Sequence, residues 1–175
     1  MVIAVPSVLV AVDAAESDTH VMEVAIKLAE REDGSLVVLH AMPPDVYGSR
    51  QLSIGRSTDL QRDGFTYTIT QAEADARTIA REAARKAVGN RDVRYIAVGK
   101  VGPLVPTVVA TATEYSCATI VIPQEKSWWK RLFGLGHRRL ANRFDGTLVQ
   151  VPHPGPPAFD PDRTPHRPVR ARQRD

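Results

Sequence analysis

The stretch VLVAVD, from Val8 to Asp13, decides the fold class, and two later stretches repeat its pattern. These are LVVLH at residues 36–40 and TIVIP at residues 119–123. Each is a continuous run rich in Val, Ile and Leu, and each is too short to cross a membrane. Continuous apolar runs of this length are typical of strands buried on both faces, as in a parallel sheet covered by helices. Because amphipathic helical stretches lie between them, we expect an α/β domain with three layers, α/β/α.

The remaining elements are predicted by apolar periodicity and by the residues that flank each segment. We expect helices at residues 19–31, 71–88 and 105–116, and a further helix after the basic loop that precedes the last strand. Strands are expected from Ile3 or Val8 to Val12 and at residues 36–40, 93–101, 119–123 and 147–152. The segment from Pro43 to Asp63 is poor in apolar residues, and it is predicted to be a long excursion without regular structure. FTYTIT, at residues 65–70, alternates and is predicted to form a short strand.

The composition fits one domain with an appendage. The chain has 175 residues, 43% of them hydrophobic, and a domain of about this size buries enough surface to fold alone. Its single cysteine, Cys117, cannot form an internal disulfide, and it suits a small buried residue in a reducing compartment. No signal-peptide pattern opens the sequence and no apolar run approaches the roughly 20 residues of a membrane span, so we expect a cytoplasmic protein.

Charge gives little support for nucleic acid as a partner. The formal charge is only +3, and the sequence carries no nucleic-acid-binding motif, so no specific nucleic acid is expected. After Pro152 the composition becomes rich in Pro and Arg, which places the domain at residues 1–152 and a disordered or extended tail at residues 153–175. Two roles are open for the tail: a solvated appendage, or an electrostatic contact with a membrane surface, an acidic protein or nucleic acid.

Asp13 and Pro123 stand at the carboxyl ends of two predicted strands. In a parallel sheet, ligands bind outside these ends, so both positions belong to a candidate site. The carboxylate of Asp13 can accept a hydrogen bond from an N–H or hydroxyl group of a ligand. The alternative is that Asp13 caps a turn or the start of the helix that follows.

Three segments resemble the universal stress protein family, with its UspA-like domain, over nearly all of residues 5–152. VLVAVDAAESDTHVMEVAIKLAEREDGSLVVLHAMPP resembles the family's opening strand, Asp, helix and second strand ending in His. GKVGPLVPTVVATATEYSCATIVIP resembles its Gly turn, helix and fourth strand, and LFGLGHRRLANRFDGTLVQVP its last glycine, helix and closing strand. The resemblance implies a five-stranded, mostly parallel sheet of the adenine nucleotide alpha hydrolase type. It also implies a homodimer, often formed through the last strand.

The resemblance also implies where a nucleotide would lie. In nucleotide-binding members of the family, ATP lies across the ends of strands one and four. By position, Asp13 would then contact the adenine or ribose, and the backbone of Ala11, Val12 and Ala41 would lie near the base.

The phosphate loop departs from the family pattern. Where nucleotide binders have two glycines, a third glycine and then Ser or Thr, this chain has Pro123, Lys126, Gly134 and Leu135. Proline has no N–H to donate, Lys126 brings a Cβ where glycine allowed close contact, and Leu135 lacks the hydroxyl. A register shifted by two would use Gly136, but either register loses two glycines. The loop is therefore not expected to be a conventional ATP cradle, and whether ATP is a cofactor stays open.

A basic segment with aromatic residues replaces the glycine-rich loop. Trp128 and Trp129 lie among lysines and arginines, with no acid between Glu125 and Asp145. The basic side chains, Lys126 included, can hold an anionic ligand. Alternatively, the tryptophan pair can dock on a membrane surface or membrane protein, and it resembles a Trp-Trp pair in a family variant fused to amino-acid transporters. The third interpretation is a solvated loop whose tryptophans cover the sheet edge or a dimer seam.

No catalytic constellation is present in the sequence. We find no Walker loop, no SGG-type pyrophosphatase loop and no Ser-His-Asp spacing, and the five histidines show no metal-ligand spacing. His40, which ends a buried strand, is predicted to be a hydrogen-bonded structural residue rather than a base. We therefore expect a protein that is not an enzyme.

The leading hypothesis is a regulatory stress-response domain that acts by binding a partner. One alternative is a sensor of ATP, AMP or a cyclic dinucleotide that uses Asp13 and the lysines and arginines. Another is a peripheral membrane or transporter-associated domain that docks through Trp128 and Trp129. The expected partners are a second copy of the chain, a membrane transporter or another protein, and Leu148, Val149 and Val151 supply an edge strand for self-pairing.

Overall fold

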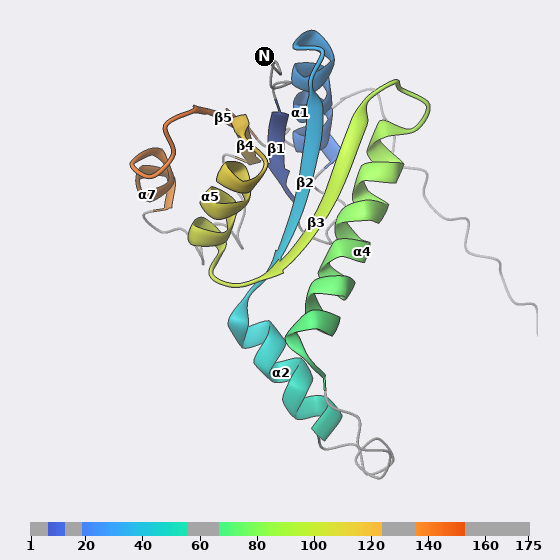
Figure 1. Ribbon diagram of the computed structural model, residues 1–175, viewed down its shortest axis with the longest axis vertical. Helices are drawn as coiled ribbons and strands as arrows, with labels where there is room; N and C mark the ends of the chain where they lie inside the picture. The colour runs from blue at the N-terminus through green and yellow to red at the C-terminus, as the bar shows by residue number, and fades with distance from the viewer. Residues whose placement is uncertain (1–6, 13–18, 56–66, 124–135, 153–175) are drawn as a thin grey trace, which may run out of the picture.

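Five strands form one sheet in which every neighbouring pair is parallel (Figure 1). The computed structural model describes residues 7–12, 19–55, 67–123 and 136–152. The strands are β1 (Ser7–Ala11), β2 (Ser35–Met42), β3 (Arg94–Val101), β4 (Cys117–Pro123) and β5 (Thr147–Val151). The helices are α1 (Thr19–Arg31), α2 (Pro44–Gly55), α4 (Ile69–Val88), α5 (Leu104–Glu114) and α7 (Gly136–Ala141). The strand order is β3-β2-β1-β4-β5, which confirms the predicted parallel sheet.

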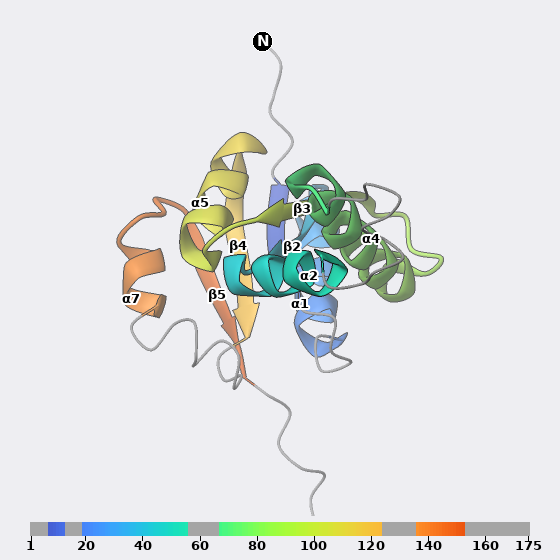
Figure 2. The ribbon, with the colours of Figure 1, turned by 90° about the horizontal axis from the view of Figure 1, so that it is seen from below.

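Helices cover both faces of the sheet, and the direction of the chain decides which face each one takes. From β1 through β2 to β3 the chain moves toward one edge, and it then returns past β1 to β4 and β5. Because crossovers between parallel strands are right-handed, this reversal moves the helices to the opposite face. Accordingly, α1 and α4 pack on one face, and α5 and α7 on the other (Figure 2). The three-layer prediction is confirmed.

The helix α4 lies unusually close to the sheet because small residues face each other. Its buried side chains recur every fourth residue: Ala72, Ala76, Ala80, Ala84 and Val88. Opposite them in β3 is Gly99, where an added Cβ would meet the backbone of α4 around Ala76 and Arg77. The small side chains on this stripe thus let the helix backbone approach the strand.

The predicted excursion from Pro43 to Asp63 is wrong over its first part, because α2 spans Pro44–Gly55. Proline at the first position of a helix is favourable, and Asp45 in the first turn complements the helix dipole. The helix lacks an apolar stripe, so its apolar residues do not recur at the spacing that predicts a helix. Residues 56–63 lie outside the described part of the chain.

The predicted strand at residues 65–70 is wrong over residues 67–70, and residues 65 and 66 lie outside the described part of the chain. Tyr67 and Thr68 precede α4, which begins at Ile69, two residues earlier than expected. Thr68 and Gln71 form a capping box: the Thr68 side chain accepts from the Gln71 N–H, and the Gln71 side chain accepts from the Thr68 N–H. This reciprocal pairing satisfies two backbone donors and outweighs the weak alternation of the sequence.

Two further predictions concern the tail and membrane-spanning segments. The predicted tail at residues 153–175 lies outside the described residues. In the part of the chain that the structure describes, no helix combines the length and apolar character needed to cross a membrane.

Candidate functional site

The strand order places a switch point between β1 and β4. The chain leaves β1 toward β2 on one side, whereas β4 is reached from β3 by the crossover through α5 on the other face. In doubly wound sheets, a ligand crevice lies outside the carboxyl ends of the two strands at such a point. The candidate site is therefore the region beyond Ala11 and Pro123, where these strands end.

Four of the predicted site residues or strand-end positions are described and lie at this edge. Ala11 and Val12 are each only 2% exposed and Ala41 is 7% exposed, so their side chains belong to the core. Pro123 is buried at the end of β4, where it pairs with Val151 of β5. The other predicted site residues lie outside the described part of the chain: Asp13, Lys126 and Gly134. Trp128 and Trp129 lie outside it as well.

The backbone of Val12 is already paired within the protein. Its N–H donates to the carbonyl of Leu39 at 2.8 Å, and its carbonyl accepts from Nδ1 of His40 at 3.0 Å. Because a carbonyl only accepts, Nδ1 carries the proton in this bond. His40 is 9% exposed, and its imidazole fixes the residue that immediately precedes Asp13. The prediction that His40 is a satisfied structural residue is confirmed.

Ala41 has backbone groups that face β1 and that no described residue pairs with there. The carbonyl of Leu39 points toward β1, so the N–H and carbonyl of Ala41, two residues later, point to the same side. The pairing of β1 with β2 ends at Ala11 and Leu39, which leaves Ala41 beyond the last paired residues. Within residues 7–12, 19–55, 67–123 and 136–152, no backbone hydrogen bond occupies these two groups on that side. An adjacent donor and acceptor of this kind match the edge of a planar heterocycle.

Pro123 removes a backbone donor at the end of β4, the other strand of the switch point. It is the last residue of β4, and its nitrogen carries no hydrogen. A phosphate held at this strand end would need backbone N–H groups close to its oxygens. The last residue of β4 therefore offers no backbone N–H to such a ligand.

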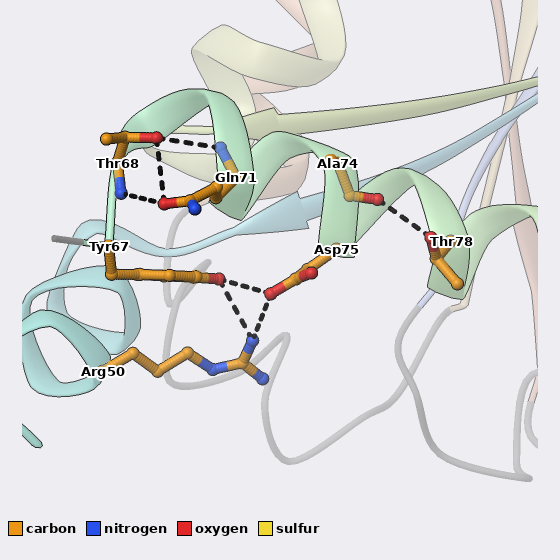
Figure 3. A network of polar contacts seen from close by, with 7 residues as sticks. All are labelled: Arg50, Tyr67, Thr68, Gln71, Ala74, Asp75 and Thr78. Atoms are coloured by element: carbon orange, nitrogen blue, oxygen red, sulfur yellow. Dashed lines mark hydrogen bonds and ion pairs between the residues drawn. The ribbon is translucent and has the colours of Figure 1, made fainter. Parts of the chain in front are cut away.

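A polar cluster at the same end of the sheet joins α2 to α4 (Figure 3). Tyr67 donates its hydroxyl hydrogen to Oδ2 of Asp75 at 2.7 Å, and Nη1 of Arg50 lies 3.5 Å from the hydroxyl oxygen and 3.6 Å from the same carboxylate oxygen. Tyr47 stacks at a tilt on Tyr67, with ring centroids 6.0 Å apart. Burial, together with the hydrogen bond to Asp75, raises the pKa of Tyr67 above its usual value.

The sequence does not predict this cluster, because its members are distant in the chain. Arg50 and Tyr47 belong to the helix that was not predicted, and Tyr67 was assigned to a strand. One feature of the sequence does indicate α2: Pro44 followed by Asp45 is a favourable start for a helix. Because Tyr67 stays protonated at neutral pH and is buried, the cluster is a structural clasp rather than a proton-transfer site.

The remaining reactive groups give no catalytic arrangement among the described residues. Cys117 is buried, as predicted, and burial raises the pKa of its thiol to about 11, so the thiol is protonated at neutral pH. No group of three or more His, Cys, Asp or Glu side chains that could hold a metal ion occurs in the described ranges.

The strand order defines a doubly wound, parallel α/β domain, a class in which ligands bind outside the strand ends at the switch point. A sequence model of the universal stress protein family matches residues 5–145, and the chain belongs to that family. The predicted resemblance is thereby confirmed. No curated protein sequence matches the chain significantly.

Solved structures of the same family share this fold. Universal stress protein UspA from Lactobacillus plantarum is 15% identical, with a TM-score of 0.58 over 84% of this chain and 97% of that chain. A universal stress protein in complex with cAMP is 19% identical, with a TM-score of 0.54 over 86% of this chain and 99% of that chain. A family member from Burkholderia pseudomallei is 14% identical, with a TM-score of 0.51 over 86% and 98% of the two chains. At these identities, the likeness shows the fold alone.

Proposed function

We propose that this chain is a non-enzymatic regulatory domain of the stress response, which does not bind ATP in the manner conventional for its family and acts by binding a partner protein. Pro123 carries the proposal: at the strand end where a phosphate needs a backbone donor, it has no N–H. The substitutions of Lys126 and Leu135 at the other cradle positions of the sequence add to this argument. Location in the cytoplasm is part of the proposal, in agreement with a protonated, buried Cys117.

The test is a titration of the purified full chain with ATP, followed by thermal unfolding with and without Mg²⁺. We expect no stabilisation by ATP at about 5 mM, because a ligand whose Kd exceeds its concentration adds less than about 0.4 kcal/mol. A clear rise in Tm with ATP, abolished by Asp13→Ala, would contradict the proposal. Lys27→Ala is a suitable control, since Lys27 lies on an exposed part of α1.

The backbone groups of Ala41 that face β1 favour a second candidate function, a sensor that binds the base of an adenine nucleotide. Asp13 and Lys126 would complete this site through the ribose and a phosphate. A neighbour of the same fold was solved in complex with cAMP, which makes cAMP and AMP the natural probes. Stabilisation by AMP or cAMP, but not by ATP, that is weakened in Asp13→Ala and Lys126→Ala would favour this function over the first.

A second copy of the chain is a further proposed partner. β5 is an edge strand with half-buried Leu148 and Val149, and unpaired strand edges tend to pair with another strand. Light scattering at several protein concentrations should give the mass of a dimer, and Val149→Lys should shift it toward the monomer. An unchanged monomer mass in the parent chain would remove this partner.

A further inference from the structure

The opposite edge of the sheet, formed by β3, has backbone groups that point away from the protein. β3 pairs with β2 alone among the described strands. The N–H of Gly102 donates to the carbonyl of Met42 at 3.0 Å, which fixes the phase of this ladder. Because alternate residues of a strand point to opposite neighbours, the N–H and carbonyl groups of Tyr95, Ala97 and Gly99 point outward.

A row of arginines lies along one flank of α4. The arginine row consists of Arg77, Arg81 and Arg85, which recur every fourth residue and are all exposed. None of the three forms an ion pair with another residue in the described part of the chain. Glu73 precedes the row by one turn, so the positive stretch is limited to these three residues.

The arginine row lies beside the open edge of β3. On the opposite flank of α4, Ala83 and Ala87 pack against the core that α1 shares, so the row faces away from α1. Away from α1 means toward the outer edge of the sheet, because α4 packs on β2 and β3 (Figure 1). The near contact at Gly99 places Arg77 level with that residue of β3.

The spacing of the row matches that of side chains on an extended strand. Residues four apart on a helix are separated by about 6 Å along its axis. Alternate residues on one face of a strand are separated by about 6.6 Å. Three acidic side chains on one face of a strand added to β3 would therefore meet the three arginines in turn.

The other face of β3 supplies an apolar contact. Ile96 is 44% exposed there, next to the buried Val98. Residues of an added strand that point to this face would lie beside Ile96, and burying an apolar side chain against it is favourable. The edge therefore fits a segment in which acidic residues alternate with apolar ones.

We propose that the β3 edge and the arginine row bind an extended acidic segment of a partner protein, which adds to the sheet as a sixth strand. Backbone pairing would give the affinity and the alternate acidic side chains the specificity, as in other cases of strand addition. A second copy of β3 is a poor occupant, because two copies would bring two arginine rows close together. The proposal rests on the proposed partner-binding function and names the chemistry of that partner.

The experiment uses a fluorescein-labelled heptapeptide in which three glutamates alternate with valine and threonine. Fluorescence anisotropy with the full chain should show saturable binding. Changing Arg77, Arg81 and Arg85 together to Gln should weaken it about tenfold, because three exposed charge pairs each contribute modestly. Lys86→Gln, on the same helix but outside the row, should change binding less than twofold. The triple variant should keep its Tm, since all three side chains are exposed.

Backbone pairing is tested on the peptide, which leaves the protein intact. Methylation of one alternate set of peptide nitrogens should abolish binding, whereas methylation of the other set should preserve it. Absence of binding at millimolar peptide, equal binding of the triple variant, or equal effects of the two methylated sets would overturn the proposal. The proposal would also be overturned if a single-stranded thymidine oligonucleotide bound more tightly than the peptide and the triple variant lost that binding. None of these outcomes would alter the ATP titration, so the two proposals fail separately.

Discussion

The helices α2 and α4 both belong to the connection between β2 and β3, yet they are held in different ways. α4 has 20 residues, and its alanine stripe lies directly on the sheet beside Gly99. α2 has 12 residues and projects from the carboxyl edge of the sheet (Figures 1 and 2). It is attached by the contact between the rings of Tyr47 and Tyr67. Arg50 adds polar contacts to Tyr67 and Asp75 (Figure 3).

This difference predicts where the molecule opens first. A helix buried along one stripe can leave the sheet only when the core is exposed, whereas a helix held by a few side chains can detach alone. We therefore expect α4 to unfold with the whole domain and α2 to open locally. Because α2 projects from the carboxyl edge of the sheet, it can open without loss of the fold.

The largest effect is expected at the close approach of α4 to β3. Gly99→Ala places a Cβ against the backbone of α4, which cannot move aside as a flexible side chain could. We expect the free energy of unfolding to fall by about 2–3 kcal/mol, as for other overpacked cores. Urea unfolding followed by circular dichroism measures this change.

Ala97→Gly is the matched control, since it removes a Cβ from the same face of β3 instead of adding one. Its cost should be about 1 kcal/mol or less. If Gly99→Ala were as stable as the parent chain, α4 would not lie as close to the sheet as described, and the contrast with α2 would lose its basis.

Weakening the clasp between α2 and α4 should lower the free energy of unfolding by less than Gly99→Ala does. Tyr67→Phe removes the hydroxyl that donates to Asp75, and it should lower the free energy of unfolding by about 1 kcal/mol. Hydrogen exchange should rise chiefly at amides of α2, because Arg50 loses a partner. A uniform rise over α4 as well would show that the two helices unfold as one unit.

The same tyrosine makes stability depend on pH in the alkaline range. Its pKa is raised in the folded state, so the folded protein favours the protonated phenol. This contribution is fully present below pH 10, the usual value for tyrosine, and is lost as the pH rises through the folded-state pKa. The parent chain should therefore lose more stability above pH 10 than Tyr67→Phe does.

A comparable but more local effect is expected at the start of α4. Thr68→Ala removes the side-chain oxygen that accepts from the Gln71 N–H, which should cost about 1 kcal/mol. Thr68→Ser keeps the acceptor and should restore most of the loss. If alanine and serine behave alike in urea unfolding, the capping box does not fix where α4 begins.

The sequence predicted those elements whose residues bury a regular pattern. β1 and β4 are continuous apolar runs, and α4 repeats alanine every fourth residue, so each could be recognised from its own residues. α2 could not, because its anchors act on Tyr67 and Asp75, which lie far along the chain. The prediction of a strand around Tyr67 was wrong because alternation of apolar residues does not take account of the capping box that begins α4.

The candidate site was predictable in position but not in detail. The ends of β1 and β2 place Ala11, Val12 and Ala41 at one edge once the strands are known. The bond from His40 to the Val12 carbonyl depends on which strands are neighbours, and no spacing in the sequence gives that. The same holds for the arginine row, whose relation to an open sheet edge appears only with the strand order.

The smallest expected effect has the opposite sign and sharpens the contrast between the helices. Gly48 lies inside α2, and an added Cβ there would meet no atom within 4 Å. Gly48→Ala should therefore favour the helix by about 0.5–1 kcal/mol, because alanine loses less backbone freedom than glycine does. Since α2 opens locally, the gain should appear as slower hydrogen exchange within α2, with little change in the urea midpoint of the whole domain. A rise in that midpoint equal to the full gain would instead mean that α2 unfolds together with α4, and the division between the two helices would have to be abandoned.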